Sequence, residues 1–459
     1  MNKDIKDSIL SCIAPVVGAF TAWTLYEARR CKIKRLYYLS RDGYALYHAA
    51  LAMAEGAVDL DIRYLSVSRY ALRIPELALV GDSFPEWLFN SGIDVTMNKI
   101  MMRIGLGGDE CLRMMKIIGF NSDPDRVMNR DELLRWKDIT KKRWGKLIPL
   151  FEGEAQEQLD TVKAYLKQEG LYDDLKIAVV DSGWVGTTLK SLQNILGRED
   201  LEGFYFGLYG IPKDAVRRNY HAFYFAPDLG IARKAYFSNC LFEVLLSEPA
   251  GMTVGYEIQS SDKHGAVCYP GIPDHTEANK MEQYIIPVHS DTENPNSDKL
   301  KIIRTMITEY AMLYGQRLDE CGVWKDETDS VAMNPKRIAA IDEIIRGDEY
   351  CERILKRFMY HPTVHEAEWF GSLKFCDDMT EESGLADVAS PLTYEDIRNL
   401  RLTEKLLNIS GIRRRTLHES AWIYASIVRC GRAVSRNLRA AARYRMMLYL
   451  RMSFRRHIG

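Results

Sequence analysis

Alternating blocks of apolar and polar residues predict a parallel sheet near the start of the chain. An apolar strand, Lys34–Leu39, is followed by the polar segment Ser40–Gly43 and by a helical stretch, Tyr44–Glu55. A second strand, Arg63–Val67, again ends in polar and basic residues. The order strand, polar loop, helix, strand is typical of a βαβ unit, so we expect these two strands to be parallel neighbours.

The same patterns continue after a long helical interval. From Pro75 to Gly170 the apolar positions recur at helical spacing, and the next strand, Lys176–Val180, precedes the polar segment Asp181–Thr188. The later elements that we expect are a helix at Leu189–Leu196, strands at Gly203–Tyr209 and His221–Phe225, a loop-rich region at 258–300, and helices from Asp298 onward. The predicted fold class is therefore α/β, with a parallel sheet, a large helical insertion and a mostly helical C-terminal region.

These boundaries divide the chain into four parts. With 459 residues, the chain is roughly three times the ~150-residue size of a typical domain. The predicted parts are an α/β core at 1–75 and 166–260, a helical insertion at 76–165, a helical C-terminal domain at 261–410, and a basic amphipathic segment at 411–459.

Composition excludes several classes of protein. Hydrophobic residues make up 47% of the chain, which excludes a disordered chain. The 62 basic and 63 acidic residues nearly cancel, so there is no basic excess to predict a nucleic-acid partner. Nine scattered cysteines without a Cys-x-x-Cys pair argue against a disulfide framework or a zinc ribbon and favour the cytoplasm. Residues 8–26 carry no charge, but polar and small residues make them only mildly apolar, so a helix at 8–30 is expected to be buried and not to span a membrane.

The segment Asp181–Thr188 has the residue types of a phosphate-binding loop. Its glycines allow close backbone approach, and the following helix offers free N–H groups to an anion. Thr187 and Thr188 add hydroxyl donors, and Asp181 suits sugar hydroxyls or a metal-bound species. The segment is no Walker loop, because Gly-Lys is absent before its threonines. The alternative is an ordinary strand-to-helix turn with a threonine at the helix N-cap.

Basic residues follow the other two strands. Arg41, Arg69 and Arg73 can bind a diphosphate through their planar guanidinium groups. Alternatively, Arg41 pairs only with Asp42 or with solvent. Because ligands bind at the carboxyl ends of parallel strands, the three segments together predict a site for a phosphorylated sugar diphosphate.

These residues resemble those of type I phosphoribosyltransferases, which bind phosphoribosyl pyrophosphate (PRPP) with magnesium. In those enzymes an apolar strand leads to two acids, three variable residues and Thr-Gly-x-Thr. Here Asp181, Gly186 and Thr188 match, whereas Val180 and Val185 replace the first acid and the first threonine. More specifically, the motifs Leu39-Ser-Arg-Asp-Gly-Tyr44, Ser66-Val-Ser-Arg69 and Asp181-Ser-Gly-Trp184 look like those of bacterial glycan phosphoribosyltransferases.

The resemblance implies transfer of 5-phosphoribose from PRPP to a hydroxyl of a glycan, in the synthesis of polysaccharides such as O-antigen or capsule that contain ribofuranose. A companion phosphatase of the haloacid dehalogenase type would then remove the phosphate. It also implies a Mg²⁺ cofactor held mainly by PRPP, with Asp42 as the candidate protein ligand. The implied PRPP contacts are Ser40, Arg41, Asp42, Gly43, Tyr44, Ser68, Arg69, Asp181, Ser182, Gly183, Trp184, Val185, Gly186, Thr187 and Thr188. Asp181 and Arg41 would also take part in catalysis.

A glycan hydroxyl needs a general base, and the segment Phe242–Pro249 offers candidates. Glu243 is the preferred one. The alternative is that Glu243 and Glu248 are solvated helix residues, and His48 is expected to be a core histidine.

Arginines are concentrated near the C-terminus. Between Arg413 and Arg456 there are twelve arginines and one acid, Glu419. Five of them, Arg429, Arg432, Arg436, Arg439 and Arg443, have the spacing of a single helical stripe, and Trp422, Ile427 and Leu438 are among the nearby apolar residues. The pattern favours a helix on the anionic inner face of the cytoplasmic membrane, beside a lipid-linked glycan. Docking on the protein's own acidic remainder and nucleic-acid binding are the alternatives.

Two other functions compete. A nucleotide-sugar glycosyltransferase would need an Asp-x-Asp motif at a strand end, and Asp59-Leu-Asp61 and Asp123-Pro-Asp125 have those letters in less suitable places. A non-catalytic module that senses PRPP or a nucleotide is the other alternative.

Overall fold

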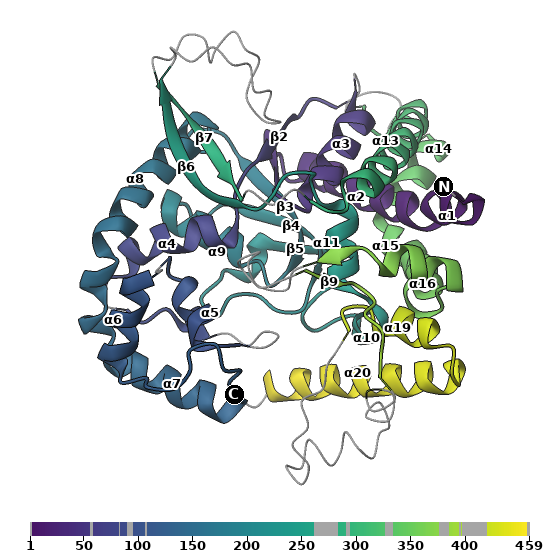
Figure 1. Cartoon of the computed structure of the whole chain (residues 1–459). Coiled ribbons are helices and arrows are strands. Elements are labelled where there is room, and N and C mark those ends of the chain that lie inside the picture. Colours follow the sequence, from purple (N-terminus) through teal and green to yellow (C-terminus); the bar gives the residue numbers. More distant parts are fainter. Residues whose placement is uncertain are drawn as a thin grey trace.

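The computed structural model is an α/β structure built on five strands that all run parallel, in the order β2-β1-β3-β4-β5 (Figure 1). It describes residues 2–55, 58–81, 83–89, 95–105, 108–260, 283–290, 294–325, 334–375, 385–393, 396 and 420–456. The strands are β1 (Arg35–Leu39), β2 (Asp61–Leu65), β3 (Ile177–Trp184), β4 (Glu202–Leu208) and β5 (Tyr220–Phe225). The predicted parallel pairing of the first two strands is confirmed.

Alternate residues of β1 face two separate hydrophobic cores. Leu36 and Tyr38 lie in the core on one face of the sheet, and Tyr37 and Leu39 lie in the core on the other face. All five residues of the strand are buried because helices cover both faces, which is the usual arrangement of a parallel sheet.

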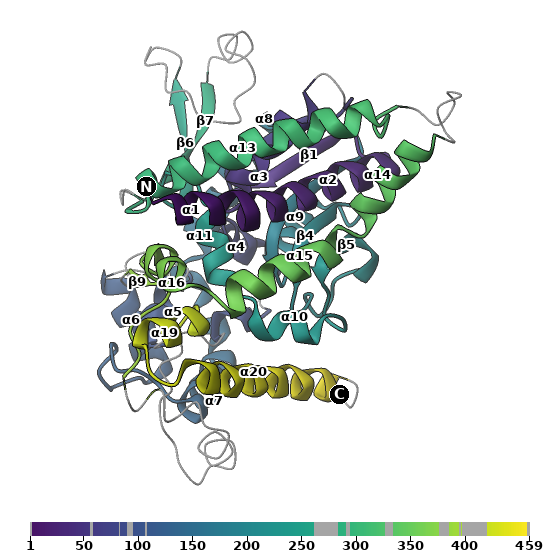
Figure 2. The ribbon, with the colours of Figure 1, turned by 90° about the vertical axis from the view of Figure 1, so that its right-hand side faces the viewer.

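The first face is covered by the N-terminal helix and by helices from much later in the chain. They are α1 (Lys3–Ser8), a π-helical turn (Ile9–Ile13), α2 (Ala14–Arg30), α3 (Gly43–Ala54), α13 (Ser297–Glu320), α14 (Pro335–Ile345) and α15 (Gly347–Leu355). Figure 2 shows α13, α2 and α15 crossing this face. The continuous helix Lys3–Arg30 is long and apolar enough to cross a membrane, and 83% of its most apolar 18-residue window is buried within the protein. That burial agrees with the predicted buried helix.

The second face is covered by α4 (Arg69–Val80), α8 (Glu152–Gln168) and α9 (Thr187–Leu196). Between α4 and α8, the described residues form helices and no strand, as predicted. These helices are α5 (Met97–Met102), α6 (Gly108–Ile118), α7 (Arg130–Lys142) and 3-10 turns at Glu86–Phe89, Trp144–Lys146 and Ile148–Leu150. They pack around a hydrophobic core of their own, which extends from Ile74 to Ala155.

The prediction of a loop-rich region at 258–300 is wrong for part of that region. An antiparallel hairpin is present, consisting of β6 (Thr253–Ser260) and β7 (Gln283–His289). Tyr256 of β6 stacks on Tyr165 of α8, with 4.5 Å between ring centroids, so the hairpin is anchored on the second helix layer. Pro287 concealed β7 in the sequence, and it is tolerated there because a two-stranded ribbon has only edge strands.

The C-terminal region is mostly helical, as predicted. Its elements, with those that lead into it, are a 3-10 turn (Arg217–Asn219), α10 (Ile231–Tyr236), α11 (Asn239–Leu246), a π-helical turn (Lys356–Tyr360), α16 (Val364–Gly371), β8 (Lys374–Phe375) paired with β9 (Ala386–Asp387), α19 (Ile423–Cys430) and α20 (Val434–Arg456). In both views α20 lies at the end of the molecule opposite the β6–β7 hairpin (Figures 1 and 2).

The predicted single stripe of arginines is broken by the structure. Gly431 and Ala433 have φ angles of 65° and 48°, and they separate α19 from α20. Arg429 lies on α19 and pairs with Asp387. Arg432 lies in the connection between the two helices, and Arg436, Arg439 and Arg443 lie on α20. Trp422 and Ile427 are buried in the core of the protein, so they do not form the exposed apolar face that the sequence suggested. Arg413 and Glu419 lie outside the described residues.

Candidate functional site

The three predicted strand-end segments meet in one pocket of about 340 Å³. Residues at or just after the carboxyl ends of β1, β2 and β3 line it together with Glu243 of α11. The predicted residues that line it are Ser40, Arg41, Asp42, Ser68, Arg69, Arg73, Asp181, Gly183, Trp184, Val185, Gly186, Thr187, Thr188 and Glu243. The Ser40–Arg41 and Gly183–Trp184 peptide bonds at its wall are both cis.

Two serines hold the strand-end segments together. The Ser40 hydroxyl donates a hydrogen bond to the carbonyl of Val67 (2.6 Å) and accepts one from the Val67 N–H (2.9 Å). The Ser68 hydroxyl donates to the carbonyl of Thr253 (2.6 Å) and accepts from the N–H of Ala71 (2.9 Å), where it caps α4. Both hydroxyls therefore shape the pocket through bonds within the chain.

Three arginines, Arg41, Arg69 and Arg73, line the pocket and bring positive charge to it. Arg41 and Arg69 both act on the Asp42 carboxyl and lower its pKa, against the larger effect of burial, which raises it. Arg73 is only 5% exposed and lies over the ring of Trp87, 4.8 Å from its centroid. Burial, followed by the nearby Arg69, lowers the pKa of Arg73 to about 9, so its guanidinium is still charged at neutral pH. This cluster of cations, in which Arg73 is buried, Arg41 half-buried and Arg69 exposed, favours an anionic ligand.

Three carboxyl groups line the same pocket. Asp181 is 8% exposed, and its pKa is raised by burial and then by the charge of Asp42. Asp42 accepts a hydrogen bond from the Ser182 hydroxyl. Glu243 of α11 accepts a hydrogen bond from the indole N–H of Trp184, and burial and Asp42 raise the pKa of Glu243 to about 7. Because like charges in one site disfavour full ionisation, these groups suit a site that exchanges protons or receives a cation.

The structure corrects the predicted phosphate loop. The strand β3 continues through Trp184, so the connection to α9 is only Val185 and Gly186. A Cβ atom on Gly183 would lie 2.1 Å from the carbonyl oxygen of Gly207, so this glycine is required for the contact between β3 and β4. Gly186, at φ 70°, is the N-cap of α9, and the alternative of a threonine N-cap is therefore wrong.

The first turn of α9 still has the features of an anion site. Its first N–H groups have no partner within the helix, and the helix dipole makes this end positive. Thr187 and Thr188 lie in this turn and line the pocket. Their hydroxyls form no hydrogen bond to other described residues.

Three predicted contacts do not line the pocket. The Ser182 hydroxyl is directed to Asp42, and Gly43 packs against the backbone of Tyr38, where an added Cβ would lie 3.1 Å from a carbonyl carbon. The ring of Tyr44 lies 4.9 Å below the guanidinium of Arg304 and 4.6 Å from the ring of His48.

The structure shows where His48 and Glu248 lie, two residues that the sequence analysis considered near the site. His48 is half-buried and packs against tyrosine rings, and burial lowers its pKa, but its Nε2 has no hydrogen-bond partner among the described residues, so the expected core histidine is confirmed only in part. Glu248 is buried, and its backbone N–H donates to the carbonyl of Arg41 (3.1 Å). The alternative that Glu243 and Glu248 are solvated is therefore wrong for Glu248, and Glu243 lines the pocket.

Tyr70, Ser247 and Met252 also line the pocket and were not identified from the sequence. Tyr70 directly follows Arg69, so its position beside a strand end was a usable signal. Ser247 and Met252 follow α11, and only the packing of this helix against the sheet brings them to the pocket.

Neither Asp-x-Asp motif reaches the pocket. Asp61 begins β2, so it lies at the amino ends of the parallel strands, away from the pocket at their carboxyl ends, and it pairs there with Arg35 and Arg63. Asp123 and Asp125 lie in an exposed turn before α7. Among the described residues, no group of three or more His, Cys, Asp or Glu side chains is arranged to hold a metal ion.

The sequence matches no known family model, and no curated protein matches it.

Proposed function

We propose that this protein is a glycan phosphoribosyltransferase, which transfers 5-phosphoribose from PRPP to a glycan hydroxyl and releases pyrophosphate. The observation that carries the proposal is the meeting of Arg41, Arg69 and Asp181 with the first turn of α9 in a single pocket. PRPP has a pyrophosphate, ribose hydroxyls and a 5-phosphate, and this pocket offers a suitable partner for each of the three.

Each part of PRPP has a proposed position. Arg41, Arg69 and Arg73 bind the pyrophosphate through charge-assisted hydrogen bonds. The 5-phosphate binds to the N–H groups and hydroxyls at Thr187 and Thr188. Asp181 accepts hydrogen bonds from the ribose hydroxyls. Asp42 lies beside the arginines, and its carboxylate is the candidate protein ligand for Mg²⁺. PRPP oxygens would supply most of the other ligands of the metal.

Transfer breaks the bond between ribose C1 and pyrophosphate and forms a bond between C1 and the glycan oxygen. The arginines stabilise the negative charge that develops on the departing pyrophosphate. Glu243 receives the proton of the attacking hydroxyl, and a pKa of about 7 suits a general base at neutral pH. Attack from the face opposite pyrophosphate converts an α-configured donor to a β-ribofuranoside. Mg²⁺, when bound, supplies further neutralisation of the pyrophosphate charge.

The proposed cellular setting is polysaccharide synthesis on the cytoplasmic side of the membrane. Arg436, Arg439 and Arg443 are exposed, and their helical spacing places them along one side of α20; Arg432, also exposed, lies just before this helix. Met446, Met447 and Leu450 extend this side as exposed apolar residues. Such a surface suits peripheral binding to anionic lipid, beside a lipid-linked acceptor that lies against residues 76–165 or the C-terminal helices. A companion phosphatase would remove the transferred phosphate.

The first test is thermal unfolding with PRPP and Mg²⁺, compared with a panel of nucleotide sugars. A ligand at 100 times its Kd adds about 2.7 kcal/mol, which corresponds to a rise in Tm of roughly 2–3 °C for a chain of this length. We expect this rise with PRPP in the wild type and in Asp123→Asn, and its loss in Asp181→Asn. Asp123→Asn is the matched control, and it also alters the exposed Asp-x-Asp motif.

A rise in Tm with a nucleotide sugar, together with no rise in Tm with PRPP, would overturn the proposal. An enzyme is separated from a PRPP sensor by pyrophosphate release, which for an enzyme must depend on added acceptor glycan. Binding of PRPP without any acceptor-dependent release would instead favour the sensor.

A further inference from the structure

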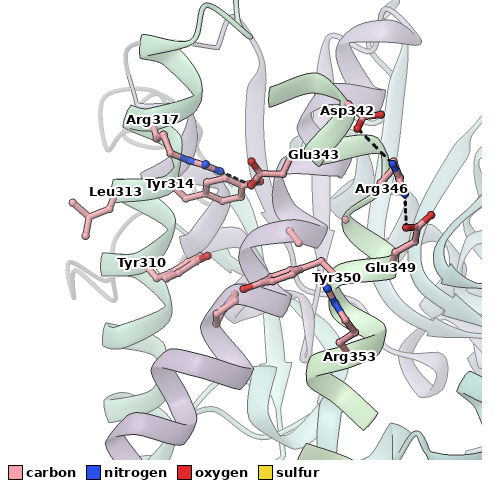
Figure 3. Close-up of a pocket in the computed structure, with 13 residues that line it drawn as sticks. Tyr310, Leu313, Tyr314, Arg317, Asp342, Glu343, Arg346, Glu349, Tyr350 and Arg353 are labelled. Atoms are coloured by element: carbon pink, nitrogen blue, oxygen red, sulfur yellow. Dashed lines mark hydrogen bonds and ion pairs between the residues drawn. The ribbon is translucent and has the colours of Figure 1, made fainter. Parts of the chain in front are cut away.

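A second pocket, of about 680 Å³, lies between the N-terminal helix and the late helices of the first layer (Figure 3). Its lining comes from α2, α13, α14 and α15, and it shares no described residue with the pocket at the strand ends. Its volume is within the range of sites that bind small molecules, which is about 300–1,000 Å³.

Tyrosines form the apolar walls of this pocket. Tyr310 and Tyr314 come from successive turns of α13, with 6.1 Å between their ring centroids, and Tyr350 comes from α15. In Figure 3, Tyr310 and Tyr350 point toward each other across the pocket. Neither hydroxyl has a hydrogen-bond partner among the described residues.

The position of Tyr310 is fixed by a glycine. A Cβ atom on Gly18 of α2 would lie 2.7 Å from Cε1 of Tyr310, so this ring packs directly against the backbone of the buried N-terminal helix. Pro15 and Ala19 of the same helix complete an apolar floor. A ring held in this way offers a flat surface at little entropic cost on binding.

The rim is charged, but its charges balance. Three arginines and three acids line the pocket, and most are paired with one another. Arg317 pairs with Glu343, which also accepts a hydrogen bond from the Tyr314 hydroxyl (3.2 Å). Arg346 pairs with Glu349 (2.9 Å) and lies 3.9 Å from Asp342. Because five N–H groups are present on each guanidinium, these pairs leave donors for a ligand and hold them in position.

Arg353 differs from the other two arginines. Its guanidinium lies 5.9 Å from the ring centroid of Tyr350, and among the described residues no carboxylate forms an ion pair with it. It therefore adds a further group of donors beside an exposed aromatic ring.

We propose that this pocket binds a neutral oligosaccharide. The C–H faces of sugar rings pack favourably on tyrosine rings, whose faces carry partial negative charge. Sugar hydroxyls both donate and accept hydrogen bonds, so they match a rim that offers guanidinium donors, carboxylate acceptors and tyrosine hydroxyls. The balance of charge disfavours a phosphorylated ligand, and the polar rim disfavours a purely apolar one. The proposal follows from this pocket alone and does not depend on phosphoribosyl transfer.

The test is saturation-transfer NMR of the full chain with four neutral probes: cellohexaose, chitohexaose, maltohexaose and α-1,6-mannohexaose. At least one probe is expected to bind the wild type, and affinity is expected to fall about tenfold in Tyr350→Ala and in Arg353→Ala. The control is Tyr172→Ala, because Tyr172 is 42% exposed, much like Tyr350 at 43%, and lies outside both pockets. Both truncations are at the surface, so the folded state is expected to persist.

Absence of binding to all four probes, or equal binding in the variants and the wild type, would overturn the proposal. Displacement of the bound sugar by inorganic phosphate would overturn it in favour of an anion site. A concentration-dependent dimer that is lost in Leu313→Asp would instead assign the surface to a second copy of the chain. The PRPP-induced rise in Tm is expected to be the same in Tyr350→Ala and in the wild type. Failure of the oligosaccharide proposal is therefore distinguishable from failure of the proposed phosphoribosyl transfer.

Discussion

The indole N–H of Trp184, at the end of β3, donates a hydrogen bond to Oε1 of Glu243 on α11. The two residues are 59 positions apart, and this bond fixes the carboxylate beside Asp42 and Asp181. The bond lowers the pKa of Glu243, whereas burial and the charge of Asp42 raise it more, to about 7. A carboxylate placed in this way is half ionised near neutral pH.

We expect the rate of glycan phosphoribosylation to rise with pH through a midpoint near 7, because Glu243 must be ionised to accept a proton. Glu243→Gln is expected to reduce kcat about 10²–10⁴-fold and to abolish this rise. The measurement is kcat between pH 5.5 and 9, with the exposed Glu309→Gln as the control. An unchanged profile in Glu243→Gln would remove this residue from catalysis.

Trp184→Phe tests the positioning bond itself. Loss of a donor to the ionised form raises the pKa of Glu243, so the rise in rate is expected to move to higher pH. At high pH most of the activity is expected to return, since the carboxylate is still present. A drop in kcat that is equal at every pH would show that Trp184 acts only through packing.

Arg69→Ala is expected to weaken PRPP binding about tenfold to a hundredfold, because hydrogen bonds to charged groups contribute roughly 1.5–3 kcal/mol. Arg69 is exposed and follows β2, so its loss leaves the cores intact. The measurement is the Kd for PRPP by calorimetry with Mg²⁺ present. Arg218→Ala, at another exposed arginine, is expected to bind as the wild type does, and equal weakening in both variants would point to a general charge effect.

Stability is expected to fall as pH rises from about 4.5 to 7 because of Glu169. This residue is 2% exposed at the end of α8, and burial raises the pKa of its carboxyl from 4.5 to about 7. The folded state therefore holds a proton that the unfolded state has lost, and the stabilisation present below pH 4.5 disappears by about pH 7. A shift of this size corresponds to roughly 3 kcal/mol.

Glu169→Gln is expected to be more stable than the wild type at pH 8 and to have a smaller loss of stability between pH 5 and 8. Urea denaturation at the two pH values measures the free energies of unfolding. Glu157→Gln, on the exposed side of the same helix, is the control. The same slope in Glu169→Gln as in the wild type would assign the pH dependence to other groups.

The exposed arginines near α20 are expected to govern membrane binding. Replacement of Arg436, Arg439 and Arg443 by Ala is expected to weaken binding to vesicles that contain anionic lipid about 100-fold, at about 1 kcal/mol for each arginine. Vesicles of zwitterionic lipid alone are expected to bind neither protein. The matched control replaces the exposed Arg126, Arg217 and Arg218, and an equal loss in the control would show that only net charge matters.

The elements that the sequence predicted best are those whose burial is uniform. Residues 36–39 are apolar and buried on both faces of the sheet, so the predicted strand at 34–39 agrees with β1 within one residue. Residues 181–184 were placed in a loop because Asp181 and Gly183 resemble turn residues. They lie in β3, since pairing with β4 satisfies their backbone and only glycine fits against Gly207. The secondary-structure propensity of residues 181–184 gives no information about Gly207, their neighbour in β4.

The sequence by itself determined the parallel α/β core and the three polar strand ends, because local periodicity and the geometry of parallel sheets place such ends at one edge. The tertiary structure decided what completes the pocket. Glu243 reaches it because α11 packs at the end of β3. Trp422 is buried because it packs on Phe358 and its indole N–H donates to the carbonyl of Met359, both in the π-helical turn Lys356–Tyr360. Contacts between residues far apart in the chain depend on packing, which local sequence patterns do not encode.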